Sequence, residues 1–438
     1  MLRWRVAALV SVAIALSYMD RQTLPWTLSQ IKAEYPFSDQ MKALFDSAFL
    51  ISYGLMYLGG GRLLDYLGTR RGFLVVMVFW SLACASQGLA GNYGLAPMAG
   101  VAVALIMLAT SRLLLGMGEG GGFPAATRVV TEWFPAQERA TAMGIMNMGT
   151  AVGAVAAPWL IALVLQHTGW GGLAPWRWVF FLSGALGLLW VGWWLWDYEV
   201  PEKHARLSEA ERAHILAGQP PAAKMVAPAI PLRDLLAHKE TWALVVAKFL
   251  SDAAWYFYMF WLPKFLMETF HINFSAASSV GWIPYAASGV GCLVGGGLSS
   301  RLLRRGATVN AARKIALGAS AALMPWVMLV PGLDSLGWVI FIFSVAFFGQ
   351  QSWSTLVMTL PTDMIPRQSV GTVAGLVGLG GAMGGVVLGQ AAGYLRDHGH
   401  SFAPVLYTAG SLHILAFALL CVAVPRIEPL KFSNTNPA

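Results

Sequence analysis

The sequence is built from apolar runs that are each about as long as a bilayer is thick. A helix needs roughly 20 predominantly apolar residues to cross the hydrocarbon core. Runs of this kind lie at 6–28, 42–64, 72–90, 97–122, 140–166, 173–196, 241–267, 276–300, 312–331, 335–358, 370–394 and 403–424. Because helices satisfy their own backbone hydrogen bonds in lipid, the pattern predicts an all-α integral membrane protein with about twelve transmembrane helices. The first run follows Arg3 and Arg5 and also has the pattern of a signal peptide, whose removal would leave an odd number of spans.

The low charge content favours a surface that is covered mainly by lipid. Only 11% of the 438 residues are charged and 57% are hydrophobic, whereas a soluble domain carries roughly 25% charged residues. Cys84, Cys292 and Cys421 lie far apart and show neither metal-ligand spacing nor a disulfide framework. Neither an HExxH nor a GxSxG string is present. The sequence therefore predicts neither an enzyme nor a metal site.

The longest polar stretch separates two sets of six apolar runs. It predicts an N-terminal six-helix bundle at 1–197, a cytoplasmic linker at 198–239 and a C-terminal six-helix bundle at 240–438. Within the linker, 207–212 has the pattern of a short amphipathic helix on the membrane surface. Two similar halves are typical of secondary transporters, which bind their substrate near the middle of the bilayer.

The distribution of Lys and Arg predicts the orientation. With both termini in the cytoplasm, most of the 29 basic residues fall on the inner side, as the positive-inside bias requires. The outer side then holds Lys32, Lys42, Arg177, Lys264 and Arg396. The same bias explains the formal charge of +8, so this charge does not indicate nucleic-acid binding.

Six charged residues fall inside the predicted spans. They are Asp20, Arg21, Arg112, Glu119, Lys248 and Asp252. A charge at the bilayer centre costs at least ~2.5–3.5 kcal/mol, so such a residue is functional by default. The six formal charges cancel, which is expected if each is neutralised by a partner or by a proton. A salt-bridge network that only holds helices together is the alternative.

The spacing of these charges suggests different roles. Arg112 and Glu119 are seven residues apart and therefore share one face of their helix, although their tips need a third partner or some bending to meet. Asp20 and Arg21 are adjacent, so they point about 100° apart. We therefore expect Arg21 to face the substrate cavity and Asp20 to face a proton path.

Lys248 and Asp252 have the i, i+4 spacing that allows an ion pair on one helix face. The pair lies toward the predicted inner end of its span. Gating or bracing of this helix and contact with substrate both remain open.

The loop between the second and third runs resembles the cytoplasmic signature of the major facilitator superfamily. The string GRLLDYLGTRR at 61–71 has glycine, then Asp65 four residues later, a glycine three residues beyond it and the basic pair Arg70 and Arg71. Tyr66 and Thr69 replace the usual basic residues, so part of the charge network of the loop differs. In the second half, the corresponding glycine is followed by arginine instead of aspartate.

Further strings resemble the anion:cation symporter family of sugar-acid transporters, and in particular its hexuronate transporters. They are YMDRQTL at 18–24, GMGEG at 116–120, FPA at 123–125, EWFP at 132–135, ERA at 138–140, GIMN at 144–147, GAV at 153–155, WYFY at 255–258 and FWLPK at 260–264. The resemblance covers nearly the whole chain and implies the major facilitator fold.

The resemblance also implies roles for individual residues. It makes Arg21 the anchor of the substrate carboxylate, and Asp20 and Glu119 the proton-coupling carboxyls, with Arg112 responding when Glu119 is protonated. It places Tyr53 at a substrate contact. On the fifth helix, where some relatives use an amide, this sequence offers Thr150 and, one turn earlier, Asn147. The asparagine of galactonate-type relatives has no counterpart at 378–381, which makes galactonate a less attractive substrate.

The second half supplies polar and aromatic side chains that suit sugar hydroxyl groups. They are Trp255, Tyr256, Trp282, Tyr285, Gln350, Gln351 and Trp353. Helix packing is the alternative for each aromatic residue, whereas an amide in an apolar helix needs a polar partner.

These features together predict a proton-coupled symporter that imports a sugar-acid anion, such as glucuronate or galacturonate, by alternating access. We expect a monomer in the bacterial inner membrane, with protons as the coupling ion and no cofactor. Another organic anion (an aldonate, an aldarate or tartrate) and sodium coupling remain open. A drug:proton antiporter is a further alternative, because Gly144, Gly153, Ala157 and Pro158 partly match its fifth-helix signature, although Ile161 replaces the closing glycine.

Overall fold

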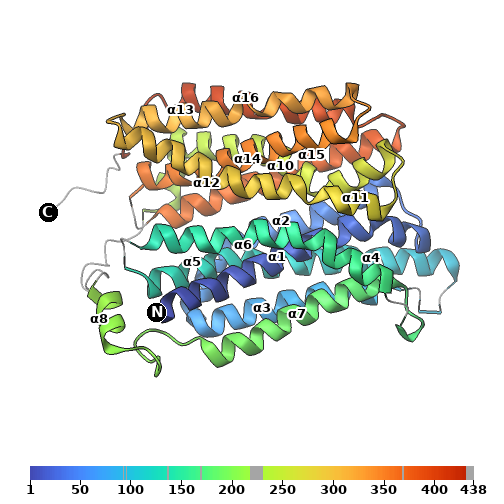
Figure 1. The fold of residues 1–438 in the computed structure, drawn as a ribbon, viewed down its shortest axis with the longest axis horizontal. Helices are drawn as coiled ribbons and strands as arrows, with labels where there is room; N and C mark the ends of the chain where they lie inside the picture. Colours follow the sequence, from blue (N-terminus) through green and yellow to red (C-terminus); the bar gives the residue numbers. More distant parts are fainter. Residues whose placement is uncertain are drawn as a thin grey trace. The chain divides into compact units, whose positions relative to one another are not determined.

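The computed structural model describes residues 1–91, 93–94, 96–135, 138–167, 170–217, 230–366 and 369–430. Every regular element in these ranges is a helix (Figure 1). Two compact units are present, and α10 (Lys239–Thr269) contributes to both of them. The predicted domain boundaries follow the linker, whereas the compact units divide α10 between Met259 and Phe260.

Unit 1 comprises Met1–Met225 together with Phe260–Trp282. Its helices are α1 (Leu2–Glu34), α2 (Asp39–Leu67), α3 (Thr69–Ser86), α4 (Pro97–Gly120), α5 (Gly122–Trp133), α6 (Arg139–His167), α7 (Pro175–Asp197), α8 (Glu209–Ala217), the second part of α10, and α11 (Phe274–Gly281). The short 3-10 turns Gln87–Leu89 and Trp170–Gly172 precede connections between long helices.

Unit 2 comprises Val226–Met259 together with Ile283–Ala438. Its helices are α9 (Leu232–Ala237), the first part of α10, α12 (Ile283–Arg304), α13 (Val309–Ala321), the 3-10 segment Met324–Gly332, α14 (Leu336–Met364), α15 (Val370–Asp397) and α16 (Ala403–Ala423).

Eleven segments of the described chain are long and apolar enough to cross a membrane. They correspond to eleven of the twelve expected runs. The remaining run, 276–300, falls on α11 and α12, which are separate helices on either side of Trp282. Polar and small residues in α12 lower its hydropathy, because glycine and serine occur throughout this helix. The chain is therefore an all-α integral membrane protein.

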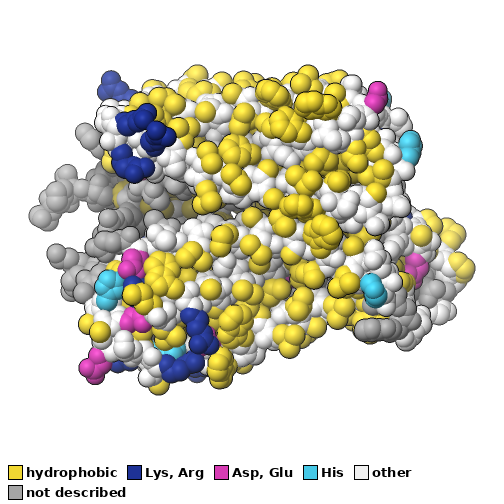
Figure 2. Space-filling view, viewed as in Figure 1, with side chains coloured by type: hydrophobic (Ala, Val, Ile, Leu, Met, Phe, Trp, Pro, Cys, Tyr) yellow, Lys and Arg dark blue, Asp and Glu magenta, His cyan; other side chains and the backbone are white. Residues whose placement is uncertain are grey.

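The surface of the helices suits contact with lipid. Figure 2 shows hydrophobic side chains spread along the sides of the helices, with Lys and Arg gathered near their ends. Leu189, Leu293 and Val422 are each at least 70% exposed. Exposed apolar area on this scale is typical of a surface that another apolar medium covers.

Glycines allow the helices of unit 1 to approach closely. A Cβ atom at Gly116, Gly118 or Gly120 of α4 would lie closer than 3.0 Å to α2 or α3, in part to their backbone. A Cβ atom at Gly153 of α6 would clash with the backbone of α1 at Ala15. Small residues have this role at many membrane helix interfaces. The glycines of GMGEG therefore allow α4 to pack closely on α2 and α3, and the glycine of GAV allows α6 to pack closely on α1.

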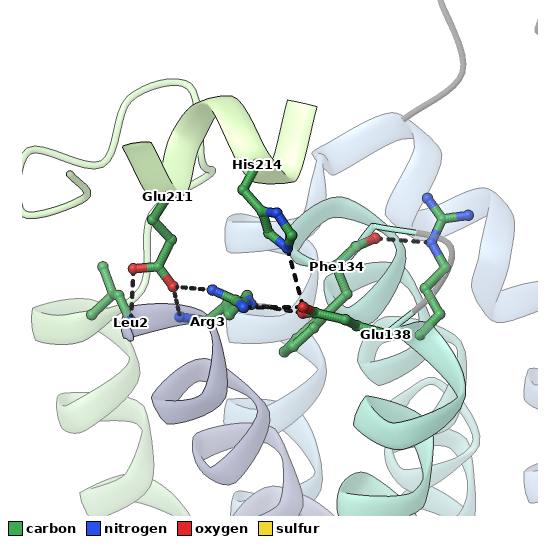
Figure 3. Close-up of polar contacts among 7 residues, drawn as sticks. Leu2, Arg3, Phe134, Glu138, Glu211 and His214 are labelled. Carbon is green, nitrogen blue, oxygen red and sulfur yellow. Dashed lines mark hydrogen bonds and ion pairs between the residues drawn. The ribbon is translucent and has the colours of Figure 1, made fainter. Parts of the chain in front are cut away.

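The linker helix α8 is tied to the start of α1 (Figure 3). Glu211 accepts hydrogen bonds from the backbone N–H groups of Leu2 (3.1 Å) and Arg3 (3.3 Å). The Arg3 guanidinium lies between two carboxylates, 2.9 Å from Glu211 and 2.7 Å from Glu138. His214 of α8 lies 3.1 Å from Glu138. The amphipathic pattern at 207–212 thus corresponds to a helix that begins at Glu209.

Candidate functional site

A buried ion pair joins α1 to α4 in unit 1. The Nε atom of Arg21 lies 2.7 Å from Oε2 of Glu119, and both side chains are at most 1% exposed. Ser17, one turn before Arg21, donates a 2.7 Å hydrogen bond to the same oxygen. Charge-assisted hydrogen bonds of this kind are the strong ones in proteins. The pair therefore holds the two helices together through a single carboxylate oxygen.

Glu119 forms its ion pair with Arg21, whereas Arg112 lies near a different carboxylate, that of Asp46. Nη2 of Arg112 lies 3.8 Å from Oδ1 of Asp46 on α2. The seven-residue spacing places Arg112 and Glu119 on one face of α4 but separates their Cα atoms by roughly 10 Å along the axis. Each of the two residues therefore contacts a neighbouring helix, and the coupled response of Arg112 and Glu119 stays a prediction.

Sequence reasoning missed two buried charges at this position. Lys42 and Asp46 are 0% and 2% exposed, and Nζ of Lys42 lies 2.6 Å from Oδ2 of Asp46. Lys42 also donates to the backbone carbonyl of Phe260 (3.0 Å) in the second part of α10. The i, i+4 spacing of the two residues is a signal for this ion pair, but the position of Lys42 at the start of its apolar run predicts an outer location for it.

Lys264 and Arg177 are also predicted on the outer side, and the structure buries at least nine-tenths of each residue. Lys264 of α10 forms an ion pair with Asp39 at the start of α2, and Lys32 lies 2.6 Å from the same carboxylate. Arg177 lies 2.6 Å from Glu34. These residues belong to ion pairs between helix ends of unit 1.

Aromatic rings surround the guanidinium of Arg21. The Arg21 Cζ atom lies 4.5 Å from the ring centre of Tyr53 and 4.6 Å from that of Tyr18. Phe49 lies near both arginines, 5.4 Å from Arg21 Cζ and 4.6 Å from Arg112 Cζ. Cation–π attraction strengthens in desolvated sites. Tyr53, the expected substrate contact, therefore lies directly at the Arg21 site.

Asp20 is buried like Arg21 but faces different helices. Its side chain is 1% exposed, and its neighbours are the Cys84 thiol of α3 and the Ser183 hydroxyl of α7. Arg21 instead turns toward α4. Adjacent helical residues diverge by about 100°, so the expected separation of the two side chains is found.

The expected polar contacts on the fifth span are only partly buried. Asn147 and Thr150 both lie on α6. The Thr150 hydroxyl donates a 2.8 Å hydrogen bond to the backbone carbonyl of Asn147. A substrate contact of Thr150 would therefore use the hydroxyl oxygen as an acceptor, and the roles of both residues stay predictions.

The aromatic residues expected at the substrate lie in different surroundings. Trp255, Tyr256, Tyr285 and Trp353 are buried in unit 2, with exposures of at most 6%. Tyr285 donates to the backbone carbonyl of Met259 (3.3 Å). Trp282 belongs to unit 1, where its Nε1 donates to the carbonyl of Ser279 (2.9 Å). These surroundings are compatible with the alternative role of the aromatic residues, which is to pack helices together. Their contact with a sugar stays a prediction.

A second buried ion pair lies in unit 2. Nζ of Lys248 is 2.9 Å from Oδ1 of Asp252, as the i, i+4 spacing predicts, and it donates to Ser354 (2.6 Å). Gln350 Nε2 donates to the same Asp252 oxygen at 3.2 Å. The Gln350 carbonyl oxygen is bonded to Nε2 of His413 on α16. Both polar ends of Gln350 are thus bonded within the unit, whereas Gln351 is only partly buried.

The loop signature between α2 and α3 keeps its turn and changes its polar contacts. Gly68 ends α2 with a φ of 74°, a left-handed conformation that favours glycine. The Thr69 hydroxyl donates a hydrogen bond to Glu132 of α5, so a neutral donor occupies the position where the resemblance leads us to expect a basic residue. Arg70 pairs with Glu199 while Arg71 is exposed. The side chain of Asp65 lies outside the described residues.

Known proteins resemble most or all of the chain. The model of the Major Facilitator Superfamily matches residues 10–389. The hexuronate transporter of Escherichia coli (strain K12) is 28% identical, with coverage of 100% of this chain and 98% of that protein. The galacturonate transporter of Dickeya chrysanthemi is 30% identical, with coverage of 67% and 81% respectively.

The fold also resembles a solved transporter structure. A D-xylose-proton symporter superposes with a TM-score of 0.71 at 13% identity, with coverage of 98% of this chain and 100% of the other. Proteins of the superfamily are transporters and not enzymes. The chain therefore belongs to the major facilitator superfamily and is a multi-pass inner-membrane transporter.

Proposed function

We propose that the protein is a proton-coupled symporter that imports a sugar-acid anion, with hexuronates such as glucuronate and galacturonate as the first candidates. Its similarity to hexuronate and galacturonate transporters supports this substrate class. A hexuronate carries one carboxylate and several hydroxyl groups. The buried guanidinium of Arg21 and the neighbouring ring of Tyr53 suit such a molecule, because a guanidinium binds a carboxylate bidentately.

The observation that carries the proposal is the 2.7 Å ion pair between Arg21 and Glu119. Removing one member of a buried pair leaves an uncompensated charge, which costs several kcal/mol. Protonation of Glu119 has this effect on Arg21, because a neutral acid no longer balances the guanidinium. A substrate carboxylate can then take the place of the Glu119 carboxylate. Proton and anion therefore bind together, and the buried charge stays balanced.

Ser17 fits the same exchange. Its hydroxyl donates to the Glu119 oxygen that Arg21 also contacts. A hydroxyl is both donor and acceptor, so it can accept a hydrogen bond from the protonated carboxyl as readily as it donates to the carboxylate. Ser17 can thus stay bonded to Glu119 in both protonation states.

Asp20 and Arg112 act beside this exchange in the proposal. Asp20 is the carboxyl that faces α3 and α7 instead of Arg21, so it passes or holds a proton without competing for the guanidinium. Arg112 shares the ring of Phe49 with Arg21. Its positive charge favours the ionised form of Glu119 through space, and it thereby promotes proton release after the anion has left.

Uptake into proteoliposomes tests the proposal. Labelled glucuronate is offered with an inward proton gradient, and galacturonate, galactonate, glucarate and tartrate compete at equal concentration. We expect accumulation that collapses with a protonophore and is blocked most strongly by galacturonate. Stronger inhibition by another acid would reassign the substrate within the organic anions. No flux of any of these acids would overturn the proposal, and efflux of a lipophilic cation would favour drug:proton antiport.

A further inference from the structure

The polar chain in unit 2 crosses three helices. Lys248 and Asp252 come from α10, Gln350 from α14 and His413 from α16. None of the four is more than 6% exposed, and His413 is fully buried. Consecutive hydrogen bonds connect them in the order Lys248, Asp252, Gln350, His413. A buried titratable group in a membrane helix is functional by default, and the exchange proposed for unit 1 uses none of these residues.

The chemistry of the partners fixes the direction of each hydrogen bond. Asp252 as a carboxylate only accepts, so the NH₂ group of Gln350 must face it. The carbonyl oxygen of Gln350 therefore faces His413, and Nε2 of His413 must carry the hydrogen that it donates. Nε2 of a neutral imidazole is then the donor, and the other ring nitrogen carries none. His413 thus keeps the amide of Gln350 turned toward the acid.

The two oxygens of Asp252 have different surroundings. Both described donors, Lys248 and Gln350, bond Oδ1. Oδ2 points at Gly381 of α15, where even a single Cβ atom would clash with it. A glycine at this position lets α15 approach Oδ2 closely. Because both donors bond Oδ1, a proton on Oδ2 displaces neither of them.

We propose that Asp252 is a second proton-binding carboxyl of the transporter, separate from Asp20 and Glu119, and that Gln350 and His413 are the positioning residues that hold its donor. The proposal rests on the proton-coupled function proposed above. In the step itself a hydronium ion of the aqueous phase gives a proton to Oδ2 of the carboxylate: one O–H bond of the hydronium ion breaks, a new O–H bond forms at Oδ2, and a water molecule is released. The charge of Lys248 is then left for an anion to balance.

Few titratable groups surround this carboxyl. Lys248 faces it from the same helix, and His413 faces it from α16 through Gln350. Within the described residues, α14 presents the Gln350 amide to Asp252 and the Ser354 hydroxyl to Lys248. From α15, the backbone at Gly381 faces Asp252. The ammonium of Lys248 favours the carboxylate, whereas burial favours the neutral acid. Two opposing effects of this kind are what a group needs to exchange protons as its surroundings change.

Infrared difference spectroscopy of the purified full-length protein tests the proposal without substrate. Lowering the pH should produce the carbonyl band of a protonated carboxylic acid. We expect Asp252→Asn to remove one component of this band, and Glu119→Gln to remove a different component. A band that is identical in wild type and Asp252→Asn would overturn the proposal. If Asp252→Asn does not fold, Asp252→Glu is measured in its place. A carbonyl band with the same position and the same pH midpoint in Asp252→Glu as in wild type would also overturn the proposal.

A matched pair of variants tests the positioning residues. His413→Gln keeps a side-chain N–H that can donate to Gln350, whereas His413→Leu removes it. We expect His413→Leu to shift the pH midpoint of the Asp252 component by about half a unit or more, roughly a threefold change in proton affinity, and His413→Gln to restore it. Equal midpoints in all three proteins would refute the role of His413.

The two proposals fail separately. A wild-type protein that shows the Asp252 band but transports no sugar acid contradicts the proposed function alone. A protein that transports sugar acid with a proton gradient but lacks the Asp252 component contradicts the second proton site alone.

Discussion

The two buried ion pairs of the transporter are built differently. In unit 1, Arg21 of α1 and Glu119 of α4 are 98 residues apart in sequence, so their contact exists only while the two helices stay packed. In unit 2, Lys248 and Asp252 stand four residues apart on α10, so the helix alone keeps them close. An ion pair between two helices breaks when the helices move apart, whereas an ion pair within one helix changes mainly when a proton or an ion binds to it.

The largest effect should come from separating the partners of the pair in unit 1. Arg21→Gln leaves the buried Glu119 without its counter-ion, a change that typically costs about 3–5 kcal/mol. We expect uptake of labelled glucuronate to fall by roughly 100-fold or more. Arg21→Lys keeps the positive charge but loses the planar guanidinium that binds a carboxylate with two hydrogen bonds. Compared with Arg21→Gln, it should therefore restore the stability of the fold more than the affinity for the substrate. Uptake near the wild-type level in Arg21→Gln would argue against an anchor at this residue.

Glu119→Gln should separate coupling from binding. The amide is the same size as the protonated acid and cannot ionise, so the variant should mimic the permanently protonated state. We expect proton-driven uptake to fall at least tenfold while exchange of internal for external substrate continues. The measurement is uptake with a proton gradient compared with counterflow without one. Full driven uptake in the variant would assign coupling to other carboxyls, with Asp252 and Asp20 the first to examine.

A double-mutant cycle should measure the interaction between Lys248 and Asp252 in unit 2 as a coupling in the free energy of unfolding. Lys248→Met and Asp252→Leu each leave one buried charge alone, and each should lower the unfolding free energy by about 3 kcal/mol. The double variant removes both charges and should be more stable than either single variant. Unfolding in detergent, followed by tryptophan fluorescence, measures the three changes. Additive losses would mean that the two charges do not depend on one another.

The smallest effect is expected at the partly exposed cluster where α8 meets α1. The hydrogen bond from Arg3 lowers the pKa of Glu138 below its ordinary value. The stability that this carboxylate contributes is therefore present above the ordinary range near pH 4 and is lost as the pH falls through the lowered pKa. Exposed pairs of this kind contribute at most about 1 kcal/mol. Arg3→Gln should remove this acid-dependent part of the unfolding free energy, and an unchanged acid dependence would contradict the assignment.

The sequence was sufficient for those features that depend on local spacing. Apolar run length predicted the helices of the fold, and the i, i+4 spacing predicted the contact of Lys248 with Asp252. Adjacent positions on α1 predicted that Asp20 and Arg21 diverge. Each of these rests on helix geometry, which is the same in every helix.

Contacts between distant helices were beyond such reasoning. Arg112 faces Asp46 and not Glu119, because the partner is determined by how α2 packs on α4. His413 is a single histidine in an apolar run, and only the packing of α16 on α14 brings it to Gln350. The amide of Gln350 did signal a buried polar partner, but the sequence did not identify Asp252 and His413 as those partners.

The glycines of α4 have a mechanical consequence. At Gly116, Gly118 and Gly120 the helix touches its neighbours at distances that leave no space for a methyl group. Because the helices interlock at these positions, α4 cannot slide past α2 or α3 without moving away from them. A displacement of one of these helices is therefore passed on to the others. Arg112 and Glu119 are therefore fixed to a rigid block of helices. A change of partner at Glu119 must then come from rotation of side chains or from movement of α1, whose single turn between Ser17 and Arg21 reaches the same oxygen.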